Sequence, residues 1–298
     1  MKEARWKRFA SYSAALGALM RPNLWDDRFC FRIVSRDWRA AGGPRLTLGE
    51  GSYFDLIDQS GPLTRELSAT AHRSADPLPA WRRLPLRARY KSEPLSLGRR
   101  VVLASVGTLT IRRTADGQGE FYVLRRIKGR TATSDDTHNV LPGGMLQPAS
   151  ISPLSRRSDL SVWRNIMREF NEEMLGAPEA VGQGGAEVDY TRRPYSDFEQ
   201  ALTAGTLRVW TFGMGLEALI LTPVLLTIAV FEADVFDVLF ADLVLEGPEG
   251  IVITKMPLRD AEVGDLLKLP NVAPPLAALL HLALRHRDLL LSAPVRTT

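Results

Sequence analysis

Residues 168–173 read Arg-Glu-Phe-Asn-Glu-Glu, and this stretch decides how the rest of the chain is interpreted. In an α-helix, Glu169, Glu172 and Glu173 stand at positions i, i+3 and i+4 and therefore share one face. Carboxylates one turn apart repel one another unless a cation compensates them. Mg²⁺ and Mn²⁺ prefer carboxylate oxygens and keep water ligands that a phosphate can displace. The stretch predicts a metal-binding helix face, with a solvated acidic surface as the alternative.

A glycine pair lies upstream of this helix, in the sequence Leu-Pro-Gly-Gly at residues 141–144, and apolar strand-like segments flank both elements. Together the two stretches resemble the signature of the Nudix hydrolase superfamily, Gx5Ex7REUxEExGU, in which U is aliphatic. The resemblance implies an α/β/α sandwich with a mixed sheet. It also implies hydrolysis of a diphosphate linkage in a nucleotide or another organic diphosphate.

The resemblance assigns roles to particular residues. Glu169, Glu172 and Glu173 would ligate Mg²⁺ or Mn²⁺, and Glu173 would also take part in catalysis. Arg168 would orient the glutamates by pairing with a neighbouring carboxylate. Gly143 and Gly144 would let the backbone approach the substrate, since a glycine has no side chain to block it.

The first half of the box departs from the family pattern. The interval from Gly144 to Arg168 is 24 positions, ten more than the pattern has, and Ser150 stands where the pattern places a glutamate. Residues 148–161 are rich in Ser and Pro and predict an inserted loop, with Asp159 or Ser161 as the N-cap of the next helix. At the far end, Gly176 is displaced by one position. The metal-binding helix is expected to be intact and the entrance loop remodelled.

Composition fits a globular chain with room for more than this one domain. The 298 residues are 45% hydrophobic and 24% charged. The single cysteine, Cys30, excludes an internal disulfide framework and a Cys-cluster zinc site. No apolar stretch is long enough for a secretory signal or a membrane span, so we expect a cytoplasmic protein.

Charge is divided unevenly along the chain. Residues 1–100 carry 19 Lys and Arg against 10 Asp and Glu, whereas residues 101–298 carry 19 against 24. A basic segment beside an acidic metal site could attract an anionic substrate or contact nucleic acid. The alternative is that its arginines are solvated or dock the segment on the acidic part. No nucleic-acid-binding motif is present in the sequence.

Two regions follow from these patterns. Residues 1–98 are expected to be a basic extension of short helices and an extended connector, with Gly61-Pro62 dividing residues 52–71 into two helices. Residues 99–298 are expected to form the Nudix-like domain. In it, residues 101–111 and 120–127 predict a strand hairpin, which matches the order of elements in a Nudix fold. The basic residues after the second strand, Arg126, Lys128 and Arg130, either contact substrate phosphates or are solvated loop charges.

Residues 207–216 and 222–233 predict two more strands, followed by a helix at 234–243. At the end of the second strand, Glu232 is a candidate extra ligand or general base, while Asp234 is expected to be an N-cap. A long helix is predicted at residues 275–291. Its leucines indicate core packing, with a homodimer seam as the alternative.

Residues 159–176 and 229–239 are similar to actinobacterial proteins labelled as transcriptional regulators with a Nudix-like domain. This second resemblance implies a ligand sensor. We therefore expect a Nudix-type hydrolase acting on a small-molecule diphosphate, and the alternative is a catalytically weak, ligand-sensing or regulatory protein of the same fold.

Overall fold

The computed structural model describes residues 9–20, 25–74, 79–90, 92–93, 96–126, 136–178, 187–245 and 251–293. The chain divides into two compact units. The first unit consists of Met1–Ala104 with Leu216–Pro223, and the second consists of Ser105–Gly215 with Val224–Thr298. The domain boundary expected between residues 98 and 99 stays a prediction. None of the helices in the described residues is long and apolar enough to cross a bilayer.

The first unit contains a β-hairpin and a long helix. Its elements are α1 (Tyr12–Leu19), β1 (Phe29–Asp37), β2 (Arg45–Ser52), α2 (Tyr53–Ser74), the 3-10 turn η1 (Trp81–Arg83) and α3 (Pro85–Ala88). The strands β1 and β2 pair antiparallel, and Gly42 and Gly43, both at positive φ, form the turn between them. The hairpin was not predicted from the sequence, and the expected extended connector contains the short helices η1 and α3.

The division of residues 52–71 at Gly61-Pro62 is wrong, because α2 runs unbroken through Pro62. Tertiary packing accounts for the continuity. A Cβ on Gly61 would lie 2.2 Å from Cε1 of Tyr12, so the glycine lets α1 pack directly on α2. On another side of the same helix, Leu56 and Leu63 are buried. The packing on both sides outweighs the hydrogen bond that Pro62 cannot donate.

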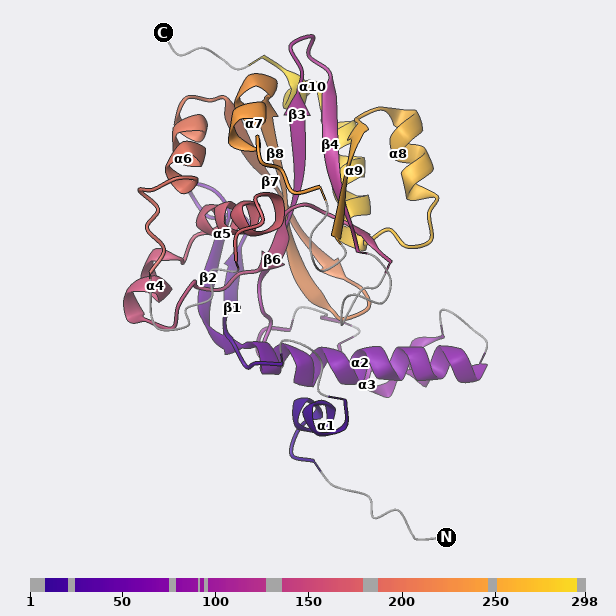
Figure 1. The fold of residues 1–298 in the computed structure, drawn as a ribbon. Coiled ribbons are helices and arrows are strands. Elements are labelled where there is room, and N and C mark those ends of the chain that lie inside the picture. The colour runs from indigo at the N-terminus through magenta and orange to yellow at the C-terminus, as the bar shows by residue number, and fades with distance from the viewer. Residues whose placement is uncertain are drawn as a thin grey trace. The chain divides into compact units, whose positions relative to one another are not determined.

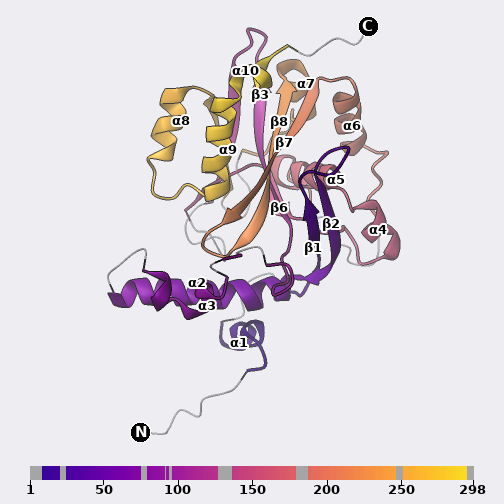
Figure 2. The ribbon, with the colours of Figure 1, turned by 180° about the vertical axis from the view of Figure 1, so that it is seen from behind.

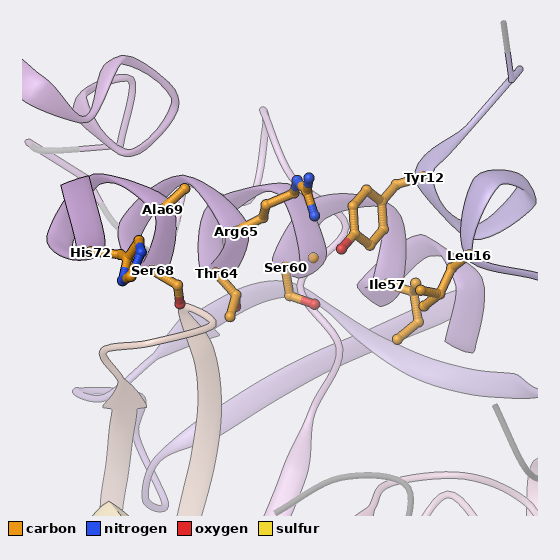
Figure 3. A pocket seen from close by; sticks show the side chains of 10 residues that line it. Tyr12, Leu16, Ile57, Ser60, Thr64, Arg65, Ser68, Ala69 and His72 are labelled. Carbon is orange, nitrogen blue, oxygen red and sulfur yellow. The ribbon is translucent and has the colours of Figure 1, made fainter. Parts of the chain in front are cut away.

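A groove of about 590 Å³ lies where α1 meets α2 (Figure 3). Tyr12 and Leu16 come from α1, and Ile57, Arg65 and His72 come from α2 (Figure 3). No carboxylate is among the residues that line it. The acidic chemistry predicted from residues 168–173 therefore has to be sought in the second unit.

The second unit is built around a mixed sheet. Its strands are β3 (Ser105–Arg113), β4 (Gly119–Arg126), β5 (His138–Asn139), β6 (Gly143–Met145), β7 (Leu207–Glu217), β8 (Thr222–Glu232) and β9 (Ile251–Pro257), with the tip of the β7–β8 hairpin assigned to the first unit. The order is β5-β4-β3-β8-β7, with β6 paired to β3 and β9 paired to β4. The pairing of β3 with β8 is parallel, and β3 pairs antiparallel with β4 and β6. The predicted strands at 101–111, 120–127, 207–216 and 222–233 are confirmed within a few residues, whereas β9 was not predicted.

Helices cover both faces of this sheet (Figures 1 and 2). The helices of the second unit are α4 (Pro153–Ser158), α5 (Val162–Glu169), the π-helical turn η2 (Phe170–Met174), α6 (Tyr195–Thr203), α7 (Ala233–Leu239), α8 (Asp260–Leu267), α9 (Pro274–Arg285) and α10 (Arg287–Leu291). Alternation along each strand divides the side chains: Leu109 and Ile111 of β3 pack with α8 and α9, whereas Thr108 and Thr110 point to the other face. On that other face, the aromatic rings of Phe170, Phe231 and Phe240 contact one another. The α/β/α sandwich with a mixed sheet is confirmed.

The long C-terminal helix predicted at 275–291 is interrupted at His286, where α9 ends and α10 begins. Leu276, Leu279 and Leu280 of α9 are fully buried in the core against the sheet. Core packing accounts for these leucines, so they give no support to a homodimer seam.

Candidate active site

The glycine pair lies on the short strand β6, at the edge of the sheet. In the antiparallel register with β3, Gly143 faces Gly107 and Gly144 faces Val106. The turn before it is anchored by the hydroxyl of Thr110, which donates to the carbonyl of Leu141 at 2.6 Å. The backbone of the glycines is therefore held in place by the centre of the sheet.

The helix that carries the glutamates begins as an α-helix and ends as a π turn. The hydroxyl of Ser161 caps α5 by accepting from the N–H of Arg164 at 3.3 Å. In η2, the N–H of Leu175 donates to the carbonyl of Phe170, five residues back, at 3.3 Å. Phe170 and Met174 are fully buried and anchor this turn in the core. π turns inside helices are rare and occur frequently at functional sites.

Two of the three glutamates converge on the glycine pair. Oε2 of Glu173 accepts a hydrogen bond from the N–H of Gly143 at 3.1 Å. A Cβ on Gly144 would lie 2.0 Å from Oε1 of Glu169, so that carboxylate occupies the space a side chain would take. Glu169 and Glu173 therefore lie against neighbouring residues of one strand. In this arrangement the glycines make room for carboxylates of the protein itself.

The helical spacing predicted one face for all three glutamates. The π turn contains an extra residue, so four positions come closer to a full turn there, and Glu169 and Glu173 both lie against β6. Burial raises the pKa of the Tyr195 hydroxyl, a hydrogen bond from Asn171 lowers it, and the charge of Glu172 raises it. The role of Glu172 as a metal ligand stays a prediction.

The carboxylates of Glu169 and Glu173 fit a hard divalent cation in their chemistry. Within the described residues, no three His, Cys, Asp or Glu side chains come together closely enough to hold a metal ion. Mg²⁺, however, is usually held by one or two carboxylates, with water and substrate phosphates completing its shell. The cradle at Gly144, which a Cβ would fill, and the pair of acids beside it are compatible with such an open site.

Arg168 is buried, with 4% of its surface exposed, and its described hydrogen bonds go to neutral oxygens. Nη2 donates to the backbone carbonyl of Gln147 and to Oδ1 of Asn165, the latter at 3.2 Å. Oδ1 of Asn165 also accepts from the N–H of Gln147 at 3.3 Å, and Nδ2 of Asn165 donates to Glu169 at 3.5 Å. Asn165 thus connects the arginine, the loop after the glycines and one of the candidate ligands.

Asn165 was not predicted from the sequence as a residue of the site. It stands three residues before Arg168 and four before Glu169, a spacing that places all three on one side of a helix. That spacing is the signal that could have identified it. The pairing of Arg168 with a neighbouring carboxylate stays a prediction.

Asp159 holds the inserted segment, residues 148–161, in place through hydrogen bonds. This carboxylate is fully buried and accepts from the N–H of Ala149 at 2.7 Å and from the hydroxyl of Tyr190 at 2.7 Å. Ser161, and not Asp159, is therefore the N-cap of α5. Ser150 is buried, and its hydroxyl accepts from the N–H of Ser152. The segment predicted as a loop also contains α4, so the insertion is a folded part of the site.

The basic residues expected at the substrate phosphates fall largely outside the described residues. Lys128 and Arg130 lie in the segment 127–135, which is outside them, and nothing is described of the side chain of Arg126. The neighbouring Arg125 forms an ion pair with Asp136 at 2.9 Å. The role of these residues in substrate binding stays a prediction.

Glu232 is not brought together with the other glutamates. It forms ion pairs with Arg113 at 2.9 Å and with Arg208 at 3.4 Å. In the parallel register Arg113 faces Glu232, six residues along β3 from Gly107, which faces Gly143. Six strand residues span about 20 Å. The proposed role as a base would require the substrate to extend that far.

Asp234 does not cap α7. Glu232 occupies the N-cap position without a side-chain bond, and Asp234 lies in the first turn, where its carboxylate accepts from the N–H of Val235 at 2.9 Å. The expected N-cap is therefore wrong by two positions. A carboxylate in the first turn still interacts favourably with the helix dipole.

No family model and no curated protein matches the chain. Solved structures with partial similarity include the Nudix domain of NrtR from Shewanella oneidensis in complex with ADP ribose, at 14% identity and a TM-score of 0.36, covering 67% of this chain and 97% of that one. A Nudix hydrolase from Alicyclobacillus acidocaldarius aligns at 20% identity and a TM-score of 0.39, covering 66% and 98%. A bifunctional NMN adenylyltransferase/ADP ribose pyrophosphatase from Francisella tularensis, complexed with AMP and a Mn ion, aligns at 13% identity and 0.33, covering 69% and 49%. At these scores the alignments do not establish a family or a shared activity.

Proposed function

We propose that this chain is a Nudix-type hydrolase that cleaves the diphosphate linkage of a nucleotide or another organic diphosphate. One observation carries the proposal: Glu169 and Glu173, from the helix that resembles the second half of the Nudix box, lie against Gly143 and Gly144. The glycines and the glutamates come from the two sequence stretches that resemble the Nudix box, and they are in contact in the structure.

Glu169 and Glu173 would hold Mg²⁺ or Mn²⁺ between them. Such an ion neutralises charge on a phosphoryl group and lowers the pKa of a bound water. Other residues of the chain hold these two carboxylates in position. The N–H of Gly143 fixes the carboxylate of Glu173, and Asn165 contacts the carboxylate of Glu169. Arg168 holds the loop after the glycines against the helix through the carbonyl of Gln147.

The test measures formation of the two phosphate monoesters from a panel of nucleoside diphosphate derivatives in the presence of Mg²⁺. Glu173→Gln is expected to reduce turnover about 100-fold or more, because it removes a charged group that acts at the reacting phosphate. Glu172→Gln is the matched control: it makes the same change one residue away, whereas Glu169 and Glu173 are the two glutamates that lie against the glycine pair. We expect it to retain most of the activity. Absence of metal-dependent turnover on every substrate would exclude the hydrolase.

A second function is favoured by one feature of the site. The position of the box glutamate is occupied by buried Ser150, and the described acids do not form a group of three. A catalytically weak, ligand-sensing protein of this fold would need to bind a diphosphate without cleaving it. Calorimetry distinguishes the two, since a sensor binds nucleotides without product formation, and failure to bind any nucleotide would exclude this alternative.

A further inference from the structure

The β1–β2 hairpin of the first unit consists of a supported half and an exposed half. In the supported half, Cys30, Phe31 and Ile33 are at most 5% exposed, and the N–H of Ile33 donates to the carbonyl of Val102 at 2.7 Å. The register shifts between Ile33 and Ser35, which leaves Val34 as a bulge. Bulges increase the twist of a strand and bend it. Beyond this point the ribbon, residues 34–47, is largely exposed, and we call it the arm.

The arm is basic. It carries Arg36, Arg39 and Arg45 against a single acid, Asp37. That acid is used within the turn, where its Oδ1 accepts from the N–H of Arg39 at 2.9 Å. Trp38, at the same turn, is 42% exposed. An exposed ribbon with a net positive charge is complementary to a polyanion.

The register distributes the arginines around the ribbon. Arg36 faces Leu46 across the strands, and Arg45 faces Asp37. Because neighbouring residues of a strand point to opposite faces, Arg36 and Arg45 lie on opposite faces, and Arg39 lies in the turn. A flat anionic surface would be met by one face only. Cations on both faces and at the tip fit a partner with a negatively charged wall on each side.

The dimensions of the arm fit a groove that has a negatively charged wall on each side. The part of β1 beyond the bulge, residues 35–37, extends about 10 Å at the usual rise per residue. The major groove of B-form DNA is roughly 12 Å wide and 8.5 Å deep, and it admits a two-stranded ribbon. The major groove of A-form RNA is too narrow for side chains to enter. We propose that the arm is a DNA-binding element that enters the major groove of duplex DNA and contacts phosphates on both walls through Arg36, Arg39 and Arg45.

Binding of this kind has a defined salt dependence. Three phosphate contacts predict a slope of about −2.7 in a plot of log K against log salt concentration. The contribution of the arm to affinity should therefore fall about 40-fold between 50 mM and 200 mM salt. Without base contacts, the dissociation constant is expected in the micromolar range.

The experiment measures fluorescence anisotropy of a labelled DNA duplex of about 20 base pairs with the full chain over a series of salt concentrations. The triple variant Arg36→Gln, Arg39→Gln, Arg45→Gln is expected to weaken binding at low salt and to flatten the slope by about 2.7, so that the ratio of wild-type to variant affinity falls about 40-fold between 50 mM and 200 mM salt. The matched control is Arg82→Gln, Arg83→Gln, Arg89→Gln, which removes the same charge from exposed positions outside the hairpin. We expect the control to keep the wild-type slope within about one unit.

Three results would overturn the proposal. The first is no measurable binding of duplex DNA at low salt. The second is an equal loss in both triple variants, which would show that net charge and not the arm is responsible. The third is equal affinity for an RNA duplex of the same sequence, because A-form geometry excludes the ribbon from the major groove. A thermal melt of each variant verifies folding, and the single variant Arg39→Gln repeats the test at the turn.

Discussion

Substituting Gly144 with alanine should impair the candidate site while leaving the stability of the fold almost unchanged. The added Cβ would lie 2.0 Å from Oε1 of Glu169 and 2.4 Å from its Cδ, whereas ordinary contacts begin at 3.4 Å. The carboxylate must therefore move by about 1.4 Å, the difference between the two distances. Metal–ligand distances tolerate deviations of only about 0.2 Å, and a misplacement of about 1 Å can cost 100-fold in rate.

The same substitution should cost little stability. The clash is with the end of a flexible side chain, and φ at Gly144 is not positive, so alanine fits the backbone. Moving the Glu169 side chain off its preferred rotamer costs about 0.5–1.5 kcal/mol. Alanine also lowers the conformational entropy of the unfolded chain, which stabilises the folded state by about 0.4–1 kcal/mol. We expect a change of less than about 1 kcal/mol, which is a shift in Tm of roughly 4 °C or less.

The assay combines calorimetric titration of the metal-free protein with Mn²⁺, steady-state formation of the phosphate monoester products and a thermal melt. Gly144→Ala should weaken Mn²⁺ binding about 10-fold or more and lower turnover about 100-fold at nearly unchanged Tm. Gly264→Ala in α8 is the matched control, because nothing lies within 4 Å of its added Cβ. Unchanged Mn²⁺ affinity in Gly144→Ala would refute the assignment of Glu169 as a ligand at this cradle.

Three further outcomes are expected. Asn165→Ala should lose about 3 kcal/mol of stability in urea unfolding, because it removes hydrogen bonds that include one to the buried charge of Arg168. Asn165→Asp keeps the acceptor for Arg168 but places a second carboxylate against Glu169, so it should restore only part of the loss. Glu232→Gln should cost about 1–2 kcal/mol by weakening its partly exposed ion pair with Arg113 and leave kcat unchanged, whereas a large loss of kcat would place this residue in catalysis after all. Burial raises the pKa of Cys30 to about 12, so the folded state keeps a proton that the unfolded thiol releases near pH 9. Its stabilising effect is complete below that pH and declines as the pH rises toward 12, so iodoacetamide at pH 8 should label Cys30 only in denaturant.

The sequence predicted the parts of the site that depend on local rules. The strands β3, β4, β7 and β8 and the helix α7 follow from apolar periodicity, and the box predicted that the acidic helix follows the glycine pair. Ser161 was one of two proposed caps for α5 and is the residue that performs this role. These features depend on neighbours within a few residues, which is the range over which a single sequence is informative.

Features that depend on distant partners were not predicted. The strand β9 pairs with β4 from more than one hundred residues away, and nothing within its seven residues indicates that partner. Pro62 predicted a helix break by its local rule, but α2 is continuous because Tyr12 and the core hold it. Local propensity is a weak guide wherever packing can override it.

The sequence predicted an α-helical period at Glu172, whereas the structure has a π turn there. Three acids at i, i+3 and i+4 share a face only if the helix keeps its α-helical period, and at Phe170–Met174 it does not. The π turn is held by the buried rings and thioether of Phe170 and Met174, so packing in the core decides which acids reach the glycines. Glu169 and Glu173 gain a common neighbour in β6. Metal binding at this cradle must therefore be judged first from these two glutamates, whose position depends on the absence of a side chain at Gly144.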